Sequence, residues 1–152
     1  LLRKYSHRFS RDMMDLGYCT VDLFRIELKP GTRPVKQRPY RHNPAVQKKV
    51  QVEIDRILAA GILRRSYSNW SSPLVVVNKA DDSIRMTCNY KKLNDSTIIP
   101  VLPIPIIEEL LDELGGAKIF PCLDITSGYF NVAIHQDSIP LTAICTQSGL
   151  YE

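Results

Sequence analysis

Two stretches of the chain carry apolar residues at the spacing of an α-helix. The first opens with Asn43-Pro44, a side-chain cap followed by a proline at the first helical position, and it ends at Gly61. The second closes at Gly115-Gly116. The sequence therefore predicts two amphipathic helices, whose apolar positions are Val46, Val50, Ile54, Ile57 and Leu58 in the first and Ile106, Leu110, Leu111 and Leu114 in the second.

Five short runs have the alternating or β-branched pattern of strands, and together with the helices they predict an α+β fold. The second and third runs can pair as an antiparallel hairpin across a polar tip at residues 78–83. The fourth is apolar enough to be buried, and a short helix around Asp137 to Leu141 precedes the fifth. The predicted strands are Phe24–Leu28, Val75–Val77, Ile84–Cys88, Ile119–Asp124 and Thr142–Thr146.

Composition limits the chain to one modest core. Its 152 residues are 44% hydrophobic and 24% charged, with a net charge of +4. The four cysteines, Cys19, Cys88, Cys122 and Cys145, lack metal-site spacing, so we expect buried free thiols in a reducing, cytosolic or nuclear setting. No apolar run reaches the length of a membrane span. The chain opens with Leu1 and stops directly after a strand-like stretch, so both ends look cut.

Basic residues gather ahead of the hairpin. Residues 33–41 form an extended basic stretch, Lys48 and Lys49 lie on the polar face of the first predicted helix, and Arg64 follows that helix. Two interpretations stay open. These residues form a surface for a polyanion such as nucleic acid, or they are an ordinary solvated face.

The run Leu123–Phe130 places one acid at the end of an apolar strand, before a turn with glycine and an aromatic pair. Such an acid, Asp124, can be held rigidly at the mouth of a cleft, where a metal ligand is useful. The alternative is a solvated aspartate that caps the turn. The only double acid, Asp81-Asp82, lies on the hairpin tip, and we interpret it as a turn device.

Leu123–Phe130 resembles the first palm motif of reverse transcriptases, and the resemblance extends in both directions. It covers the chain from about Ile26 to the end. The order and spacing of its blocks are similar to the fingers and first part of the palm of a gypsy-type LTR retrotransposon polymerase. The other blocks are Ser71–Lys79, Ile84–Asn94, Leu102–Pro105, Leu114–Phe120, Thr142–Thr146 and Gly149–Glu152.

The resemblance implies a partial right-hand polymerase fold, with a fingers hairpin and helices plus part of an antiparallel palm sheet. It implies a tether from an upstream polyprotein at residues 1–22, fingers and connector at 23–118, and a truncated first part of the palm at 119–152. The implied partners are an RNA or DNA template with its primer, deoxynucleoside triphosphates, and the rest of the Pol polyprotein, including the remaining palm, the thumb and an RNase H. The implied setting is a virus-like particle in the cytoplasm or nucleus.

The activity implied by the resemblance is nucleotidyl transfer with two Mg²⁺ ions. The carboxylate of Asp124 and the backbone carbonyl of Ile125 would be metal ligands. In the family, the other essential acids belong to a later Tyr-x-Asp-Asp motif, and that motif does not occur in this sequence. We therefore expect a fragment of an RNA-directed DNA polymerase that is inactive alone.

The resemblance also implies a nucleotide site. Lys79 would meet the γ-phosphate and Arg85 the α-phosphate; without the resemblance they are an ordinary turn lysine and an ordinary strand cation. Ser127 and Gly128 would bring backbone N–H groups to the β- and γ-phosphates. Tyr129 would lie under the sugar and exclude a 2′-hydroxyl, unless its ring packs in the core beneath the turn.

Two further aromatic residues have structural alternatives. Trp70 can stack on a single-stranded template or pack under the hairpin. Phe130 is expected to pack beneath the turn.

Asn89 departs from the family pattern. The chain has Cys88-Asn89-Tyr90-Lys91 where relatives commonly show Val-Asp-Tyr-Arg, and the lost charge can weaken an ion pair. Two other functions therefore stay open. One is a non-catalytic nucleic-acid-binding remnant of a retroelement, and the other is a protein-interaction module built on the proline-rich connector at residues 100–105.

Overall fold

The secondary structure largely follows the predicted order of helices and strands. The computed structural model describes residues 2–11 and 15–152. The predicted tether at residues 1–22 includes residues 1 and 12–14, which lie outside this described part. The elements are η1 (Leu2–Arg8), α1 (Pro44–Ala59), β1 (Ser72–Asn78), β2 (Ile84–Cys88), α2 (Lys91–Asp95), α3 (Ile107–Glu113), η2 (Gly128–Asn131), η3 (Gln136–Thr142), β3 (Ile144–Thr146) and β4 (Gly149–Tyr151).

Helix α1 begins and ends where the local signals predict. Asn43 Oδ1 accepts a hydrogen bond from the backbone N–H of Val46 at 2.8 Å, and Pro44 starts the first turn. Gly61 follows the helix with φ of +71°, a left-handed conformation that favours glycine. The first predicted helix is confirmed, and its boundaries are fixed by these local signals.

The sheet confirms the predicted hairpin and the α+β class. β1 and β2 pair antiparallel, with Leu74 opposite Cys88 and Asn78 opposite Ile84. β3, which lies within the predicted strand Thr142–Thr146, pairs parallel with β1 and antiparallel with β4. The strand order is β2-β1-β3-β4, so the sheet is mixed rather than purely antiparallel.

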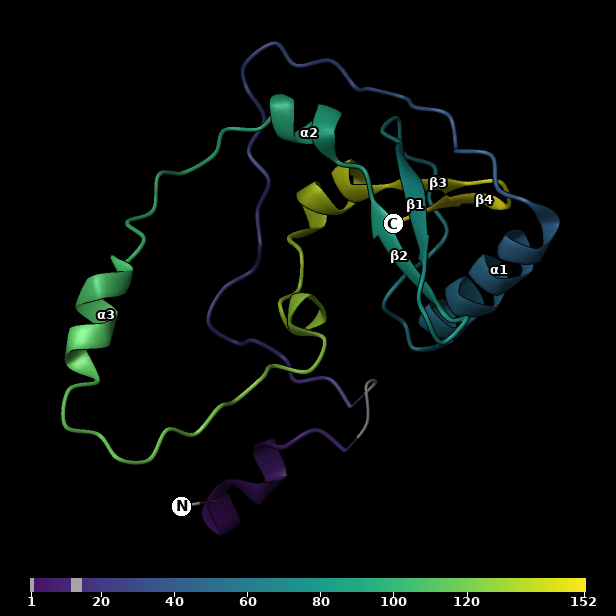
Figure 1. Cartoon of the computed structure of the whole chain (residues 1–152). Coiled ribbons are helices and arrows are strands. Elements are labelled where there is room, and N and C mark those ends of the chain that lie inside the picture. The colour runs from purple at the N-terminus through teal and green to yellow at the C-terminus, as the bar shows by residue number, and fades with distance from the viewer. Residues whose placement is uncertain (1, 12–14) are drawn as a thin grey trace.

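The core lies between α1 and the sheet (Figure 1). It joins Val50 and Ile54 of α1 to Leu74 of β1 and Tyr151 of β4. Ile54 is 2% exposed and Tyr151 is 1% exposed. We call α1 and the four strands the sheet module, because they share this core.

Residues 64–66 extend the sheet module at the outer edge of β4. The backbone N–H of Arg64 donates to the Glu152 carbonyl and that of Glu152 donates back, both at 2.9 Å. Arg64 Nη2 also lies 2.8 Å from Glu152 Oε1, and Ser66 Oγ donates to Glu152 Oε2 at 2.6 Å. The Glu152 side chain is only 9% exposed, so Arg64 neutralises a nearly buried carboxylate.

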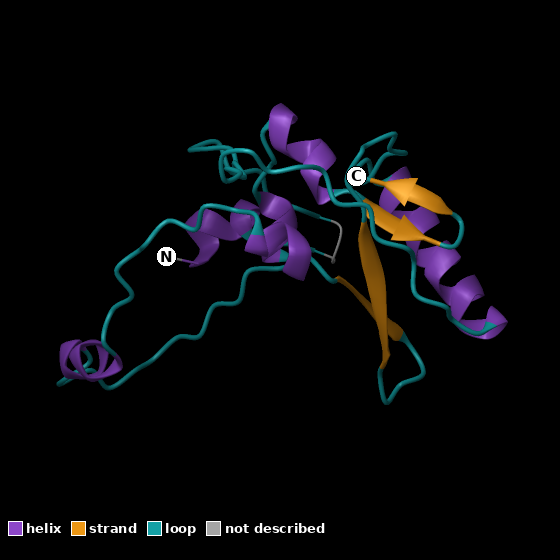
Figure 2. Ribbon diagram, turned by 90° about the horizontal axis from the view of Figure 1, so that it is seen from above, coloured by secondary structure: helices purple, strands orange, loops and turns teal. Residues whose placement is uncertain are grey.

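Residues 99–130 form a limb that extends away from the sheet module between α2 and η2, with α3 at its far end (Figures 1 and 2). The predicted strand Ile119–Asp124 is wrong, because these residues form exposed irregular chain. Ile119 is 87% exposed and Leu123 is 75% exposed. No described strand lies beside this run to accept its backbone hydrogen bonds, and an unpaired strand is not stable in water.

The second predicted helix is present as α3, although its apolar face is uncovered. Gly116 closes the helix region with φ of +81°. Leu110, Leu111 and Leu114 are each about half exposed, and no residue of α3 is buried. The local pattern therefore forms the helix, while no described element packs on it.

The predicted strand Phe24–Leu28 is wrong as a continuous element. Phe24 makes a parallel bridge with Ile134, whereas Leu28 makes an antiparallel bridge with Thr97. Because the two ends of the run pair with different partners in opposite directions, no ladder forms along it.

All four cysteines are free, as expected, although their burial differs. Cys145 is buried, Cys19 and Cys88 are half-buried, and Cys122 on the limb is exposed, so the expectation of burial is wrong for Cys122. Burial raises the pKa of Cys88 to about 12, so its thiol stays protonated at neutral pH. No described helix is long and apolar enough to cross a membrane.

Candidate nucleotide and metal site

The turn after Asp124 has a defined backbone shape. Ser127 adopts φ of +48°, a left-handed conformation that is rare for a residue other than glycine, and η2 starts at the next residue. The backbone N–H of Phe130 donates to the Ser127 carbonyl at 2.8 Å. We call residues 126–131 the nucleotide turn.

The side chain of Asn131 closes the nucleotide turn from its C-terminal end. Its Nδ2 group donates to the carbonyls of Thr126 at 3.0 Å and Ser127 at 3.2 Å. The sequence analysis missed this residue. The available signal was an amide side chain three positions after Gly128, where it can reach back to the carbonyls of a tight turn.

Tyr129 projects into solvent from the nucleotide turn, with an exposed fraction of 98%. The alternative that its ring packs in the core does not hold in this structure. Phe130 is 48% exposed, so the expectation that it packs beneath the turn is met only in part. The Tyr129 ring is therefore free to contact a ligand.

The two predicted metal ligands precede the turn on the exposed limb. Asp124 is exposed and makes no hydrogen bond or ion pair with a described residue, and Ile125 is 73% exposed. Among residues 2–11 and 15–152, no group of three or more His, Cys, Asp or Glu side chains converges as a metal site. Asp124 thus presents one carboxylate, and the described residues build no metal-binding cluster around it.

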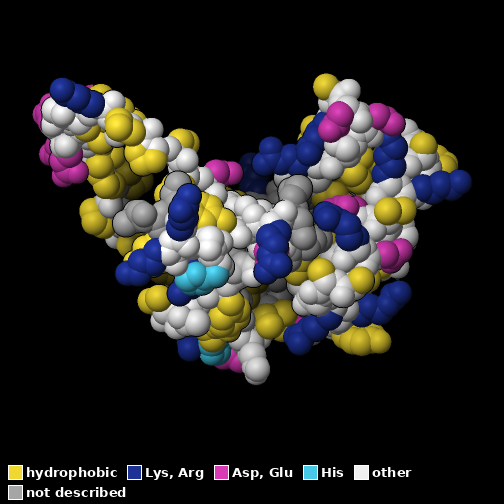
Figure 3. Space-filling view, turned by 90° about the horizontal axis from the view of Figure 1, so that it is seen from below, with side chains coloured by type: hydrophobic (Ala, Val, Ile, Leu, Met, Phe, Trp, Pro, Cys, Tyr) yellow, Lys and Arg dark blue, Asp and Glu magenta, His cyan; other side chains and the backbone are white. Residues whose placement is uncertain are grey.

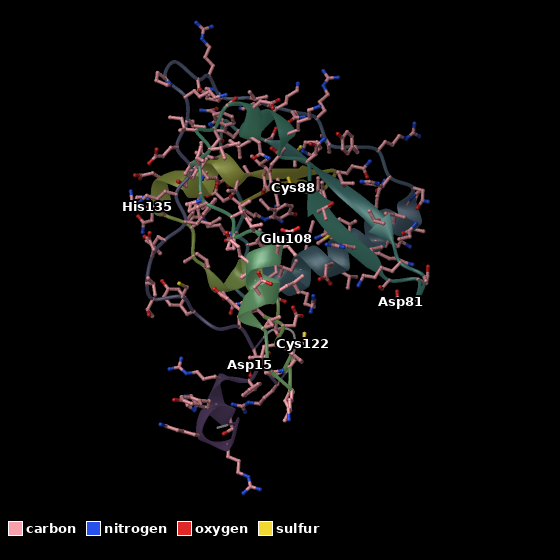
Figure 4. The ribbon with its side chains drawn as sticks, turned by 60° about the vertical axis from the view of Figure 1, so that its left-hand side comes forward. Asp15, Asp81, Cys88, Glu108, Cys122 and His135 are labelled. Atoms are coloured by element: carbon pink, nitrogen blue, oxygen red, sulfur yellow. The ribbon has the colours of Figure 1, made fainter. Side chains whose placement is uncertain are left out.

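The hairpin tip carries the two predicted phosphate ligands. Arg85 is opposite Val77 in the β1–β2 register, and Lys79 follows the end of β1. Both are exposed, and neither side chain makes a hydrogen bond or ion pair with a described residue. The tip and the limb lie apart: Asp81, at the tip, and Cys122, on the limb, are on different branches of the molecule (Figure 4).

The acidic pair at the tip forms the turn, as predicted. Asp81 Oδ1 accepts hydrogen bonds from Ser83 Oγ at 2.6 Å and from the Ser83 backbone N–H at 3.0 Å. These hydrogen bonds, the hydroxyl first, lower the pKa of Asp81 below its ordinary value. Asp82 has φ of +61° and binds Lys49, whose Nζ lies 2.8 Å from Asp82 Oδ1 and 2.7 Å from its carbonyl oxygen.

The predicted nucleic-acid surface divides into free and engaged cations. Lys48 is exposed and without a described partner, whereas Lys49 binds Asp82 and Arg64 binds Glu152. Trp70 is 7% exposed, which favours packing under the hairpin over stacking on a template. Blue lysine and arginine side chains are spread over the face in Figure 3 rather than gathered in one patch.

A pocket of about 340 Å³ lies between α1, the preceding segment and the β3–β4 turn. Its lining includes Val50, Leu74 and Cys145 together with polar side chains such as His42 and Ser148. Of the predicted site residues, only Lys48 is among the described residues that line it.

Asn89, which departs from the family pattern, is well accommodated here. Its Nδ2 group donates to Tyr40 Oη at 3.0 Å, and its Oδ1 accepts from the Lys91 backbone N–H at 3.2 Å. The adjacent Tyr90 hydroxyl donates to the Thr142 carbonyl at 2.8 Å, and burial raises the pKa of this phenol. The amide thus has two partners where the expectation was only a lost charge.

Comparison with known proteins identifies the relatives of this chain. No protein-family model matches it. It is 35% identical over 142 residues to the retrovirus-related Pol polyprotein from transposon opus of Drosophila melanogaster, an alignment that covers 90% of this chain and 14% of the relative. It is 32% identical over 131 residues to the enzymatic polyprotein of Cauliflower mosaic virus strain CM-1841, covering 84% of this chain and 19% of the relative.

Solved structures of prototype foamy virus protease-reverse transcriptase have the same fold. One matches with a TM-score of 0.75 and 24% identity over 99% of this chain and 20% of the viral chain. The chain is a relative of retrovirus-related Pol polyproteins, and it has the fold of reverse transcriptase. A foamy viral protease-reverse transcriptase solved in complex with an RNA/DNA hybrid also matches this chain, with a TM-score of 0.76 and 21% identity over 99% of this chain and 20% of that one. The chain thus spans one fifth or less of the length of these relatives.

Proposed function

We propose that this chain supplies the fingers and the first part of the palm to an RNA-directed DNA polymerase. The polymerase adds deoxynucleotides to a primer paired with an RNA or DNA template. The observation that supports this most is the shaped nucleotide turn with its exposed Tyr129, placed directly after Asp124 in a chain that is related to Pol polyproteins and has the reverse transcriptase fold. The rest of the Pol polyprotein would supply the remaining palm, the thumb and an RNase H, within a virus-like particle in the cytoplasm or nucleus.

The residues around Asp124 fit part of a magnesium site. The Asp124 carboxylate and the Ile125 carbonyl are the hard oxygen donors that Mg²⁺ prefers, and no described side chain occupies that carboxylate. Two Mg²⁺ ions, when bound, would activate the 3′-hydroxyl of the primer and neutralise the triphosphate. One carboxylate cannot hold both ions, so the proposal places the other acidic ligands in a later part of the polyprotein.

The remaining site residues would hold the nucleotide. Lys79 and Arg85 carry positive charges near the hairpin tip that form no ion pair with a described residue, which suits the γ- and α-phosphates. The backbone N–H groups of Ser127 and Gly128 would meet the β- and γ-phosphates. The Tyr129 ring would lie under the sugar, where its bulk leaves no room for a 2′-hydroxyl.

Primer extension by the full-length polyprotein tests the proposal. We expect Asp124→Asn to abolish extension and to leave primer–template affinity nearly unchanged, because it removes a metal ligand and no basic surface. Asp112→Asn is the matched control: it removes an exposed acid of the same limb and should extend normally.

Normal extension by Asp124→Asn would contradict the metal assignment. A parent that binds primer–template and never extends it would instead support the alternative, a non-catalytic nucleic-acid-binding remnant. The isolated 152-residue chain should not extend a primer in either case.

A further inference from the structure

The nucleotide turn keeps a strained shape with little help from the core. None of the residues of η2 is buried, Tyr129 is 98% exposed, and Ile125 before the turn is 73% exposed. A left-handed serine costs on the order of 1 kcal/mol or more, and it persists only where its surroundings determine it. Some other group must therefore stabilise the conformation of Ser127.

The Asn131 side chain is one such group. Its Nδ2 donates to two successive carbonyls, those of Thr126 at 3.0 Å and Ser127 at 3.2 Å. These carbonyls belong to the peptide units that join Thr126 to Ser127 and Ser127 to Gly128. Fixing both carbonyls also fixes the N–H groups of Ser127 and Gly128, because each peptide unit is planar.

Asn131 is in turn held by residues 17–19, near the N-terminal end of the chain. Its carbonyl accepts a hydrogen bond from the backbone N–H of Cys19 at 2.7 Å. Gly17 lies against its side chain, and a Cβ atom added at Gly17 would be 2.7 Å from Asn131 Oδ1. A side chain at position 17 would therefore push the Asn131 amide out of its present position.

We infer that Asn131 is a positioning residue for the nucleotide turn and that residues 17–19 keep its amide in place. This inference rests on the proposed function, because it concerns the same nucleotide site. Residues 17–19, which belong to the predicted upstream tether, would thus stabilise the turn that would receive the triphosphate and the sugar. Asn131 itself would touch neither the nucleotide nor the metal.

The expected consequence is a change in nucleotide binding and selection. Without the amide, the N–H groups of Ser127 and Gly128 lose their fixed direction, and the backbone that carries Tyr129 loses its fixed shape. The KM for deoxynucleotides should rise while kcat changes little, and ribonucleotides should be admitted more readily.

The experiment is steady-state primer extension by the full-length polyprotein with Asn131→Ala, Asn131→Asp, Gly17→Ala and the Gly17→Ala/Asn131→Ala double variant. Loss of two hydrogen bonds should raise the KM by about tenfold in either Asn131 variant. Asn131→Asp keeps the size of the side chain and loses the donor. Asn94→Ala, which removes an exposed amide of α2, is the control and should match wild type.

The double variant gives the sharpest result. If Gly17→Ala acts by displacing the Asn131 amide, it should raise the KM in the wild-type background and add nothing when residue 131 is already alanine. Additive effects of the two substitutions, or an unchanged KM and ribonucleotide preference in Asn131→Asp, would overturn the inference. Unchanged primer–template affinity in each variant shows that it is folded.

The Asp124→Asn variant separates this inference from the proposed function. If Asp124→Asn is inactive and Asn131→Asp is normal, the inference fails and the polymerase assignment stands. If Asp124→Asn extends normally, only the metal assignment fails; if the unsubstituted polyprotein binds primer–template and never extends it, the proposed function fails, and the inference fails with it.

Discussion

The sheet module and the limb are both rich in apolar residues, but the sheet module buries them and the limb leaves them exposed. In the sheet module, Val50, Ile54, Leu74 and Tyr151 share one core and are at most 6% exposed. On the limb, apolar side chains remain in solvent, and the α3 arm projects with yellow apolar and magenta acidic side chains at the left of Figure 3. Hydrophobic pattern therefore forms local elements in both regions, and it gives stability only where a second surface is present to cover them.

The two regions also carry different parts of the proposed chemistry. The hairpin of the sheet module presents Lys79 and Arg85, and the contact between Lys49 and Asp82 ties the tip of this hairpin to α1. The limb carries Asp124 and Tyr129, and its shape depends on local hydrogen bonds such as those of Asn131. The proposed phosphate ligands thus stand on a packed scaffold, whereas the proposed metal ligand lies on an exposed segment that leads into the hydrogen-bonded turn.

The largest expected effect is a difference in the stability cost of a substitution in the sheet module and one on the limb. Ile54→Ala should lower the free energy of unfolding by about 2–5 kcal/mol, because it leaves a cavity in a core residue that is 2% exposed. Leu111→Ala on α3 removes a side chain that is 61% exposed and should change it by no more than about 0.5 kcal/mol. Urea denaturation of the three proteins measures both values, and equal losses would contradict the division into module and limb.

A smaller effect tests the function of the limb. In the full-length polyprotein, Tyr129→Val should raise the use of ribonucleotides relative to deoxynucleotides by at least about tenfold, because the proposed function assigns the exclusion of the 2′-hydroxyl to the bulk of the ring. Lys79→Ala should weaken both classes of nucleotide equally, since it acts on the phosphates. Competition between the two nucleotide classes in primer extension measures the ratio, and an unchanged ratio for Tyr129→Val would remove the ring from the site.

The smallest effect concerns the basic face of α1. Lys48→Glu should reduce the slope of primer–template affinity against salt by about one unit, because Lys48 is exposed and unpaired among the described residues. Lys49→Gln should change the slope less, since that ammonium already binds Asp82. The reverse order, measured by titration at several salt concentrations, would mean that the Lys49 contact opens to bind nucleic acid.

Local sequence signals predicted the helices correctly. The two wrong strand predictions concern runs whose structure depends on partners far away in the sequence. Asn43, Pro44 and Gly61 mark the ends of α1 within a few residues of sequence, and the hairpin tip is equally local. The run Ile119–Asp124 has a strand pattern, yet a strand also needs a neighbour, and sequence pattern carries no information on whether one is present. The same reasoning applies to Phe24–Leu28, whose two ends pair with distant and different segments.

The candidate site was predicted by resemblance more than by physics. Asp124 and Tyr129 were identified from their motif, while Asn131 was missed because its role depends on a turn shape that only the coordinates reveal. Lys49 and Arg64 were predicted as free cations, since their partners Asp82 and Glu152 lie 33 and 88 residues away along the chain. A cation with a distant partner and a free cation have the same appearance in a sequence.

The limb is anchored at both ends by backbone hydrogen bonds, from Ile98 to Glu27 on one side and from His135 to Phe24 on the other. Closing this loop costs conformational entropy, and the cost grows only with the logarithm of the number of residues in the limb. Doubling the limb would cost about 0.6 kcal/mol, much less than one buried isoleucine contributes to the core. Insertions between Ile98 and the nucleotide turn are thus thermodynamically cheap, and the sheet module tolerates them without any change in its own packing.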